Sequence, residues 1–345
     1  MAVMAADEPR LGIHLAHGIG LIRAAERAVE LGLTTVQVFG DNPTAYRRRA
    51  EPSTDLPAFR ERLTAAGIDP IAIHASYLVN PAGADPVNRE RSIELLASEL
   101  ETAPRFGATL VNVHIGSHGG AGVEAGRGSI VDVIGRAREL ATARGGADLP
   151  LIVLENSAGG GFGMGVDVDE LAGIATALDA AGLDDRAVGF CLDAAHAWGA
   201  GIDMADPATI DDLLESFDRR IGLDRLRLVH LNDSSTGRGS RTDRHQHLGA
   251  GQIGAVGLGH LLRHPRLGRV PFILETPGME EGYDALNVER ARALLRDEPL
   301  ADLPPEAFRL PARRSRRSKP ATGPAADPGH PPRRTEVVAV GTTRA

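Results

Sequence analysis

The stretch Leu151-Ile152-Val153-Leu154-Glu155-Asn156 is short and apolar and ends in polar residues. Seven other stretches have a similar form, and amphipathic segments separate them along the chain. They lie at residues 11–15, 34–39, 70–75, 109–114, 187–193, 226–232 and 270–276. Strands that are apolar along most of their length are buried on both faces, so the eight stretches are typical of a parallel sheet covered by helices.

The segments between the predicted strands have the apolar spacing of amphipathic helices. Several of them end at a glycine, such as Gly32, Gly107 and Gly182, as helices often do. The predicted helices cover residues 21–31, 57–66, 85–106, 129–144, 168–181, 207–221, 256–262 and 283–295. Eight strand–helix units over roughly 290 residues predict a (β/α)8 TIM barrel at residues 11–300.

A doubly wound open sheet is the competing architecture. It predicts a glycine-rich phosphate-binding loop directly after the first strand. Residues 14–20 read His-Leu-Ala-His-Gly-Ile-Gly, which does not match that pattern. The sequence therefore favours the closed barrel.

The composition excludes several classes of protein. The single cysteine, Cys191, cannot form a disulfide within the chain, so any metal site must use histidine and carboxylate ligands. The chain has no apolar run of about 18 residues, and its first ten residues lack the apolar core of a signal peptide. We therefore expect a cytoplasmic protein without a membrane partner, and we expect it to be a monomer.

The net charge of −8 is unevenly distributed along the chain. Residues 311–345 contain eight basic and two acidic residues; removing them from the totals of 38 and 46 leaves 30 basic and 44 acidic residues, a net charge of −14. This Pro- and Arg-rich stretch without apolar periodicity predicts a disordered basic tail, and residues 1–10 are also expected to be disordered. An acidic body argues against general nucleic-acid binding, so its carboxylates need an explanation.

Histidines and carboxylates recur at the carboxyl ends of the predicted strands. In a TIM barrel these ends converge on one face, so the side chains would share one pocket. Carboxylates and imidazoles crowded in a pocket need a compensating positive charge, which divalent metals supply. Two further pairs follow the sixth and seventh strands. The candidate ligands are His74, His114, Glu155, Asp193, His196, His230, Asp243, His245 and Glu275.

Nine ligands exceed the needs of a single ion. With about three to four protein ligands for each ion and one bridging carboxylate, they suit three ions with open positions for water or substrate. Nitrogen and oxygen donors without sulfur favour zinc or manganese. Several metals together can neutralise the charged oxygens of a phosphodiester during its cleavage, which indicates phosphoester hydrolysis. Arg241 and Arg244 flank Asp243 and are candidate phosphate contacts.

Whole motifs of the chain resemble endonuclease IV, the trinuclear-zinc apurinic/apyrimidinic endonuclease of base excision repair. The resemblance runs in order from about residue 11 to residue 295. It is carried by HASYL at 74–78, NVHIGSH at 112–118, LENSAG at 154–159, CLDAAHA at 191–197, HLND at 230–233, GSRTDRH at 239–245, LGAGQIG at 248–254 and ILET at 273–276.

The resemblance implies a role for each ligand. One zinc would be held by His74, His114 and Glu155, a second by Asp193, His230 and Glu275 with Glu155 bridging, and the third by His196, Asp243 and His245. A hydroxide between the first two ions would attack the phosphate 5′ to an abasic site in duplex DNA. Glu155 and Glu275 would be the catalytic carboxylates, with Glu275 as the base. The products would be a 3′-hydroxyl and a 5′-deoxyribose phosphate, and Tyr77 and Leu78 match the family's loop that enters DNA at the lesion.

The chain departs from the family pattern in three places. After the second predicted strand the family has an Asn-Gln-Arg-type segment whose arginine inserts into DNA, whereas residues 39–46 here read Phe-Gly-Asp-Asn-Pro-Thr-Ala-Tyr and are followed by three arginines at 47–49. The inserting arginine is therefore either missing or shifted. Ala194 and Ala195 replace a usually polar pair, and Ile115 replaces a proline. These departures concern the grip on substrate, because the nine candidate ligands are all present.

Two other functions stay open at this point. A single-metal sugar isomerase or epimerase of the xylose-isomerase-like barrels would need only Glu155, Asp193, His230 and Glu275. A non-catalytic damaged-DNA binder would keep the metals for stability. The main prediction is three Zn²⁺ ions per chain, with Mn²⁺ as the alternative ion at one or more sites, so the number of bound ions separates it from the isomerase.

Overall fold

A closed barrel of eight parallel strands forms the centre of the molecule. The computed structural model describes residues 9–49, 51–279 and 281–309. The barrel strands are β1 Leu11–His14, β2 Thr35–Phe39, β3 Ile71–His74, β4 Leu110–His114, β5 Leu151–Glu155, β6 Val188–Asp193, β7 Leu226–His230 and β10 Phe272–Leu274. Each lies within one of the predicted strands, and the closing pair is β1 with β10. The predicted (β/α)8 TIM barrel is confirmed.

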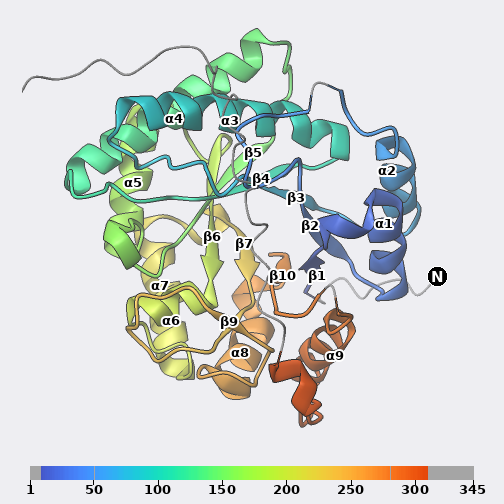
Figure 1. Ribbon diagram of the computed structural model, residues 1–345. Helices are drawn as coiled ribbons and strands as arrows, with labels where there is room; N and C mark the ends of the chain where they lie inside the picture. The colour runs from blue at the N-terminus through green and yellow to red at the C-terminus, as the bar shows by residue number, and fades with distance from the viewer. Residues whose placement is uncertain (1–8, 50, 280, 310–345) are drawn as a thin grey trace, which may run out of the picture.

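Helices surround the strands on the outside of the barrel (Figure 1). They are α1 Leu21–Glu30, α2 Leu56–Ala65, α3 Pro86–Phe106, α4 Val123–Ala143, α5 Val168–Ala180, α6 Ala194–Ala200, α7 Pro207–Arg220, α8 Gly254–Arg263 and α9 Asp284–Leu295. Among the described residues, none of the helices has both the length and the apolar character needed to cross a bilayer.

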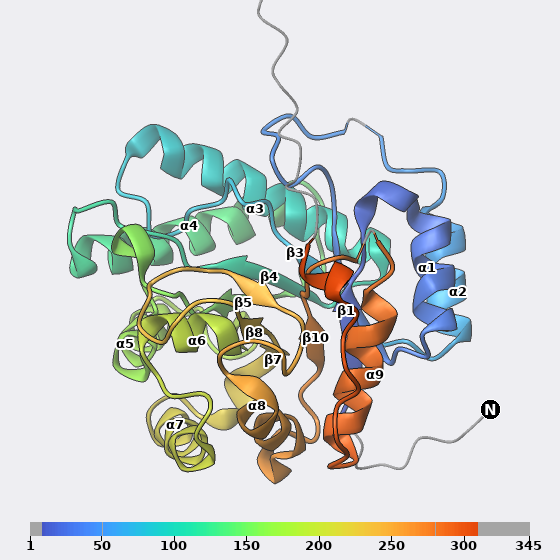
Figure 2. The same cartoon turned by 60° about the horizontal axis from the view of Figure 1, so that its bottom comes forward.

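The first and last helices of the ring pack together, as Figure 2 shows. Arg27 of α1 donates from Nε and Nη2 to the two carboxylate oxygens of Asp284 in α9, over 2.9 and 2.6 Å. Arg292 of α9 donates to the carbonyl oxygen of Leu31, at the end of α1. These contacts close the helical ring over the junction between β1 and β10.

Side chains inside the barrel alternate with side chains that face the helices. On β3, Ala72 belongs to the interior cluster, whereas Ile71 and Ile73 belong to the larger core beneath the helices. The interior cluster consists of Ala72, Leu110, Val153, Cys191, Leu228 and Ile273. Because strand side chains repeat every two residues, the next inward positions are His74, Asn112, Glu155, Asp193, His230 and Glu275. The inward face of the barrel thus changes from apolar to polar at its carboxyl end.

Helix α4 begins at Val123, six residues before the predicted start at residue 129. Gly126 and Gly128 lower the helix propensity of this turn, so the sequence pattern favours a later start. A Cβ atom on Gly126 would lie 2.2 Å from Sδ of the fully buried Met164. Tertiary packing therefore requires a glycine here and overrides its local cost.

The predicted disordered ends fall mostly outside the described residues. Residues 1–8 and 310–345, which include the basic tail at 311–345, are not described. Arg10 is described, and its carbonyl oxygen accepts a hydrogen bond from the backbone N–H of Phe272 over 2.8 Å. The chain is therefore fixed to β10 one residue before β1 begins.

Candidate metal centre

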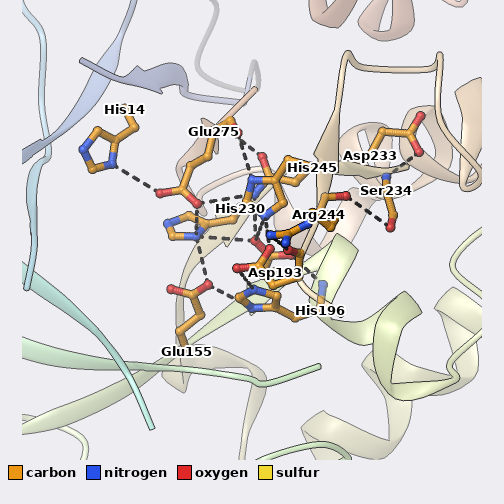
Figure 3. Close-up of polar contacts among 12 residues, drawn as sticks. His14, Glu155, Asp193, His196, His230, Asp233, Ser234, Arg244, His245 and Glu275 are labelled. Carbon is orange, nitrogen blue, oxygen red and sulfur yellow. Dashed lines mark hydrogen bonds and ion pairs between the residues drawn. The ribbon is translucent and has the colours of Figure 1, made fainter. Parts of the chain in front are cut away.

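The nine predicted ligands lie together at the carboxyl end of the barrel, and Figure 3 shows most of them. Among these nine residues, three groups have ligand atoms that all lie within 4.8 Å of one another: His74, His114 and Glu155; Glu155, Asp193, His230 and Glu275; and Asp193, His196 and His245. Asp243 lies between the two histidines of the third group. Residues far apart in the sequence, from position 74 to position 275, thus form one cluster.

The first group consists of His74, His114 and Glu155 at the ends of β3, β4 and β5. The Nε2 atoms of His74 and His114 lie 3.8 and 3.5 Å from Oε2 of Glu155. Nδ1 of His74 donates to the carbonyl oxygen of Ala75 over 2.8 Å, which leaves the lone pair of Nε2 directed at the carboxylate. Burial, together with the neighbouring His114, lowers the pKa of His74 to about 4, so its imidazole is in the neutral form that binds metals.

The second group surrounds His230 at the end of β7. Its Nδ1 lies 3.4 Å from Oε1 of Glu155, 3.3 Å from Oε2 of Glu275 and 3.7 Å from Oδ2 of Asp193. Its Nε2 donates to Oε1 of Gln37 over 3.1 Å, and this bond fixes the orientation of the ring. Burial alone would raise the pKa of Glu155, but the charge of His230 outweighs it and holds that pKa well below its ordinary range.

The third group extends from the barrel into the loop after β7. Nε2 of His196 lies 3.3 Å from Oδ2 of Asp243, and Nε2 of His245 lies 3.0 Å from Oδ1 of the same residue. Although burial lowers the pKa of His245, the neighbouring carboxylate of Asp243 outweighs burial and raises that pKa to about 9. The carboxylate of Asp243 thus faces both rings of this group.

Local structure explains how the third group is positioned. Oδ1 of Asp193 accepts the backbone N–H of His196 over 2.8 Å, so Asp193 caps α6 and places His196 one turn away. The short strands β8 (Asp233–Ser234) and β9 (His245–Gln246) pair with each other, with Ser234 opposite His245. The position of His196 therefore depends on the cap of α6, and the position of His245 depends on the pairing of β8 with β9.

Three buried atoms of the nine predicted ligands lack a hydrogen-bond partner among the described residues. They are Oε1 of Glu155, Nδ1 of His230 and Nε2 of His245. Buried polar atoms are nearly always satisfied in folded proteins, and unpaired ones suggest an ion or water. All three atoms point into the ligand groups, so the residues present fit divalent cations with nitrogen and oxygen ligands.

Buried amide side chains that were not predicted as site residues orient the carboxylates. Asn112 donates to Oε2 of Glu155 over 2.6 Å, and Asn232 donates to Oδ2 of Asp193 over 2.7 Å. Gln37 donates to Oε1 of Glu275 over 2.7 Å. Neighbours of this kind fix the ligands of metal sites. The sequence signal that could have found Asn112 is its inward position on β4, two residues before His114.

His14 also contacts the centre. Its Nδ1 lies 3.3 Å from Oε1 of Glu275 and 3.0 Å from Nε2 of Gln37. His14, Gln37 and the carboxylate of Glu275 therefore form one polar cluster beside the ligands.

Asp233, in the ribbon beside the third ligand group, has a different role. Its carboxylate accepts the backbone N–H groups of Ser234, Gly251 and Ile253 over 2.8 to 3.0 Å. A Cβ atom on Gly251 would lie 2.4 Å from the carboxylate, so a glycine is required there. The glycine-rich motif at residues 248–254 thus serves to close the loop before α8.

A cavity of about 560 Å³ opens above the centre. Tyr77 and Arg244 line it, together with several of the ligands. Tyr77 is 53% exposed, and its ring centroid lies 5.6 Å from that of His74 and 6.2 Å from that of His114. Arg241 is exposed in the loop that carries Asp243, whereas Leu78 is partly buried and packs against the main core.

The fold and the site together place the chain among the xylose isomerase-like TIM barrels. A family model of that description matches residues 25–298. The crystal structure of a D-tagatose 3-epimerase-like protein covers 84% of this chain and 96% of its own at 17% identity, with a TM-score of 0.58. At that identity the likeness concerns the fold alone.

More similar relatives identify a particular family within the xylose isomerase-like TIM barrels. Probable endonuclease 4 from Methanoculleus marisnigri is 39% identical over 284 residues, which cover 82% of this chain and 98% of the relative. Probable endonuclease 4 from Oleidesulfovibrio alaskensis is 41% identical over 287 residues, with 82% and 94% covered. The structure of endonuclease IV from Thermus thermophilus has 40% identity and a TM-score of 0.70, and it covers 84% of this chain and 100% of its own. The chain belongs to the endonuclease IV family.

Proposed function

We propose that this protein hydrolyses the phosphodiester 5′ to abasic sites in duplex DNA with three zinc ions, leaving a 3′-hydroxyl and a 5′-deoxyribose phosphate. The observation that carries the proposal is the third ligand group. A single-metal isomerase has no use for Asp243 placed between His196 and His245, 3.3 and 3.0 Å from their Nε2 atoms. Three ions suit a phosphodiester, whose attacking, leaving and nonbridging oxygens all carry charge.

The ligand groups give each ion its own set of residues. Glu155 would bridge two ions, since its Oε2 faces His74 and His114 and its Oε1 faces His230. When bound, the ions would lower the pKa of water and neutralise charge on the phosphate oxygens. Manganese is the alternative ion at one or more of these positions, because the donors are nitrogen and oxygen only.

Glu275 would accept the proton of the attacking water. Its side chain is 16% exposed and lines the cavity, whereas that of Glu155 is fully buried. Although burial raises the pKa of Glu275, the charge of His230 outweighs burial and lowers that pKa, so the carboxylate is ionised at neutral pH. Its Oε1 is held by Gln37 and His14, which leaves Oε2 directed at the ligand group.

Residues around the cavity would bind the DNA. Arg244 lines the cavity and is exposed, and Arg241 is exposed on the same loop, so both can contact phosphates. Tyr77, with Leu78 behind it, would enter the duplex at the lesion. Entry is easiest at an abasic site, because the missing base removes stacking that would oppose it.

The test is a cleavage assay on a duplex with one tetrahydrofuran abasic analogue. We expect one nick 5′ to the analogue with an extendable 3′-hydroxyl, lost on chelation and absent from the undamaged duplex. Elemental analysis of the same sample should find three ions per chain. Asp243→Asn should lose the third ion and the nicking, whereas Asp169→Asn, on the exposed face of α5, should lose neither.

Two outcomes would contradict the proposal. One ion per chain without nicking would favour a sugar isomerase or epimerase. Tight binding of the abasic duplex without metal-dependent nicking would favour a non-catalytic damaged-DNA binder.

A further inference from the structure

Glu99, in the middle of α3, is a buried carboxyl group that is not one of the metal ligands. The residue is 3% exposed. Its Oε1 accepts a hydrogen bond from Nη2 of Arg48 over 2.5 Å and another from the backbone N–H of Ser76 over 3.3 Å. A Cβ atom on Gly40 would lie 2.8 Å from its Oε2. The end of β2, the following loop and the turn after β3 therefore meet at one carboxyl group.

The two segments that meet at Glu99 also contact each other directly. The hydroxyl of Ser76 donates to the carbonyl oxygen of Pro43 over 2.7 Å, and the backbone N–H of Tyr77 donates to the same oxygen over 3.1 Å. Nη1 of Arg48 donates to the carbonyl oxygen of Asn42 over 3.2 Å. The segment at residues 40–49, which we call the rim loop, is thus joined to the backbone that carries Tyr77.

Helix α3 holds the rim loop at a second point. The guanidinium of Arg91 lies 5.0 Å from the ring centroid of Tyr46, a cation–π distance. Phe39 directly precedes the rim loop, and its ring centroid lies 5.4 Å from that of Tyr77. The position of Tyr77 above the metal ligands therefore depends on the rim loop, and α3 fixes the rim loop.

Stability of the fold alone does not explain an arginine–glutamate pair in which Glu99 is buried and the side chain of Arg48 is only 15% exposed. Apolar residues of similar volume often serve stability equally well or better, because burying two charges costs solvation energy. Apolar side chains could not accept the N–H of Ser76 or donate to the carbonyl oxygen of Asn42. The distinctive contribution of the pair is to hold the two segments together.

We propose that Arg48 and Glu99 form a positioning device that locks the rim loop to the segment carrying Tyr77 and thereby sets the protein's grip on DNA at the lesion. This inference rests on the proposed function. Arg48 and Glu99 act through Tyr77 and contact no reacting atom, so they govern the binding of DNA rather than the hydrolysis step.

The first test measures hydrogen exchange in the metal-loaded protein without DNA, so it does not depend on activity. Arg48→Met/Glu99→Leu replaces the pair by apolar side chains of similar size. Peptides covering residues 41–49 and 75–78 should exchange at least about tenfold faster than in the wild type. The matched control is Arg136→Met/Glu90→Leu, an exposed arginine–glutamate pair between α3 and α4, and it should leave these peptides unchanged.

The second test separates binding from hydrolysis. In the same variant we expect the KM for the abasic duplex to rise about tenfold while kcat changes by less than about twofold. Hydrolysis of bis(4-nitrophenyl) phosphate, a diester too small to span the rim, and the metal content should match the wild type. Ser76→Ala removes the bond to the carbonyl oxygen of Pro43 and also the acceptor of the backbone N–H of Leu78, so it should change exchange and KM in the same direction. This second variant keeps the test decisive if the double variant does not fold.

Unchanged exchange in both variants would overturn the inference. Equal losses on the small diester and on DNA would also overturn it, since the pair would then act on the metal centre. A wild-type protein that does not nick the abasic duplex would instead contradict the proposed function, and the exchange comparison would still decide whether the pair holds the rim loop.

Discussion

Glu275 differs from the other predicted ligand carboxylates of the barrel interior because it is partly exposed and lines the cavity. Glu275→Gln keeps the volume of the side chain but removes a ligand charge and the proposed base. We expect the protein to remain folded and nicking of the abasic duplex to fall by about 10² to 10⁴. Single-turnover cleavage, with circular dichroism as the check on folding, measures both quantities.

The control for this substitution is Glu289→Gln. Glu289 lies on the outside of α9, where it pairs with Arg292, so the same chemical change should leave nicking at the wild-type rate. Cleavage by Glu275→Gln at the wild-type rate would show that Glu275 is neither the base nor an essential ligand.

A second residue, Glu99, should make stability depend on pH. Burial raises its pKa from 4.5 to about 7, although Arg48 and the N–H of Ser76 oppose the shift. The folded protein therefore keeps a proton that the unfolded chain loses above pH 4.5. This contribution to stability is complete below about pH 4.5 and is lost as the pH rises to about 7, by on the order of 3 kcal/mol.

Glu99→Gln should remove this contribution, since the amide does not titrate in that range. The measurement is the free energy of unfolding in urea between pH 4.5 and 8, compared between wild type and variant with the metal content matched. The difference between the two proteins should change with pH in this window and be constant above it. If the free energies of unfolding of the two proteins changed with pH in parallel, the carboxyl of Glu99 would titrate at its ordinary pKa.

At the scale of elements, the strands and most of the site could be predicted because each strand carries its own signal. An apolar run that ends in His or Glu, such as 151–155, identifies both a strand and the residue at its carboxyl end. Parallel strands in a closed barrel then bring those ends together, whatever their separation in the sequence. This is why the six predicted ligands at the strand ends lie together, namely His74, His114, Glu155, Asp193, His230 and Glu275.

Residues in the middle of the strands could not be assigned in the same way. Gln37 lies in the apolar stretch of β2 and contacts His14, His230 and Glu275, all from other strands or their ends. Nothing in its own segment marks these partners. Only the alternation of inward positions, applied to every strand, would have singled out Gln37 and Asn112.

The loops were least predictable, because their contacts are distant in the sequence. Arg48 pairs with Glu99, 51 residues away, so the sequence around the rim loop gives no sign that this arginine is held inside. Helix α6 was not predicted as a helix, since it has only seven residues and follows β6 without a loop. Asp193 is a predicted ligand and also caps α6, so a residue of the site itself fixes this local structure.

At the scale of the whole molecule, net charge by itself is a poor guide to the partner. Four carboxylates of the acidic body, Glu155, Asp193, Asp243 and Glu275, lie in the candidate metal centre. Three divalent ions would add about six positive charges there and make the cavity attractive to phosphate. An acidic barrel with a positive centre is therefore compatible with binding DNA.

The negative charges of the buried carboxylates predict that bound metal ions stabilise the fold. Glu155 and Asp193 are almost fully buried, and without cations their charges are balanced only by nearby histidines. Ions that bind the folded chain at about a hundred times their dissociation constant stabilise it by about 2.7 kcal/mol for each site, or about 5 °C in Tm for a chain of this size.

Chelation should therefore lower the Tm in calorimetry, and the loss should be steepest when the ions bound by buried Glu155 are removed. Adding back Zn²⁺ should restore the Tm, whereas Mg²⁺ should not, because it prefers an all-oxygen site and the centre offers five histidines. The metal content has to be measured on the same samples. If Tm stayed constant after elemental analysis confirmed that the ions were gone, the buried carboxylates would have to be neutralised by the protein alone, and the metals would serve catalysis without contributing to the fold.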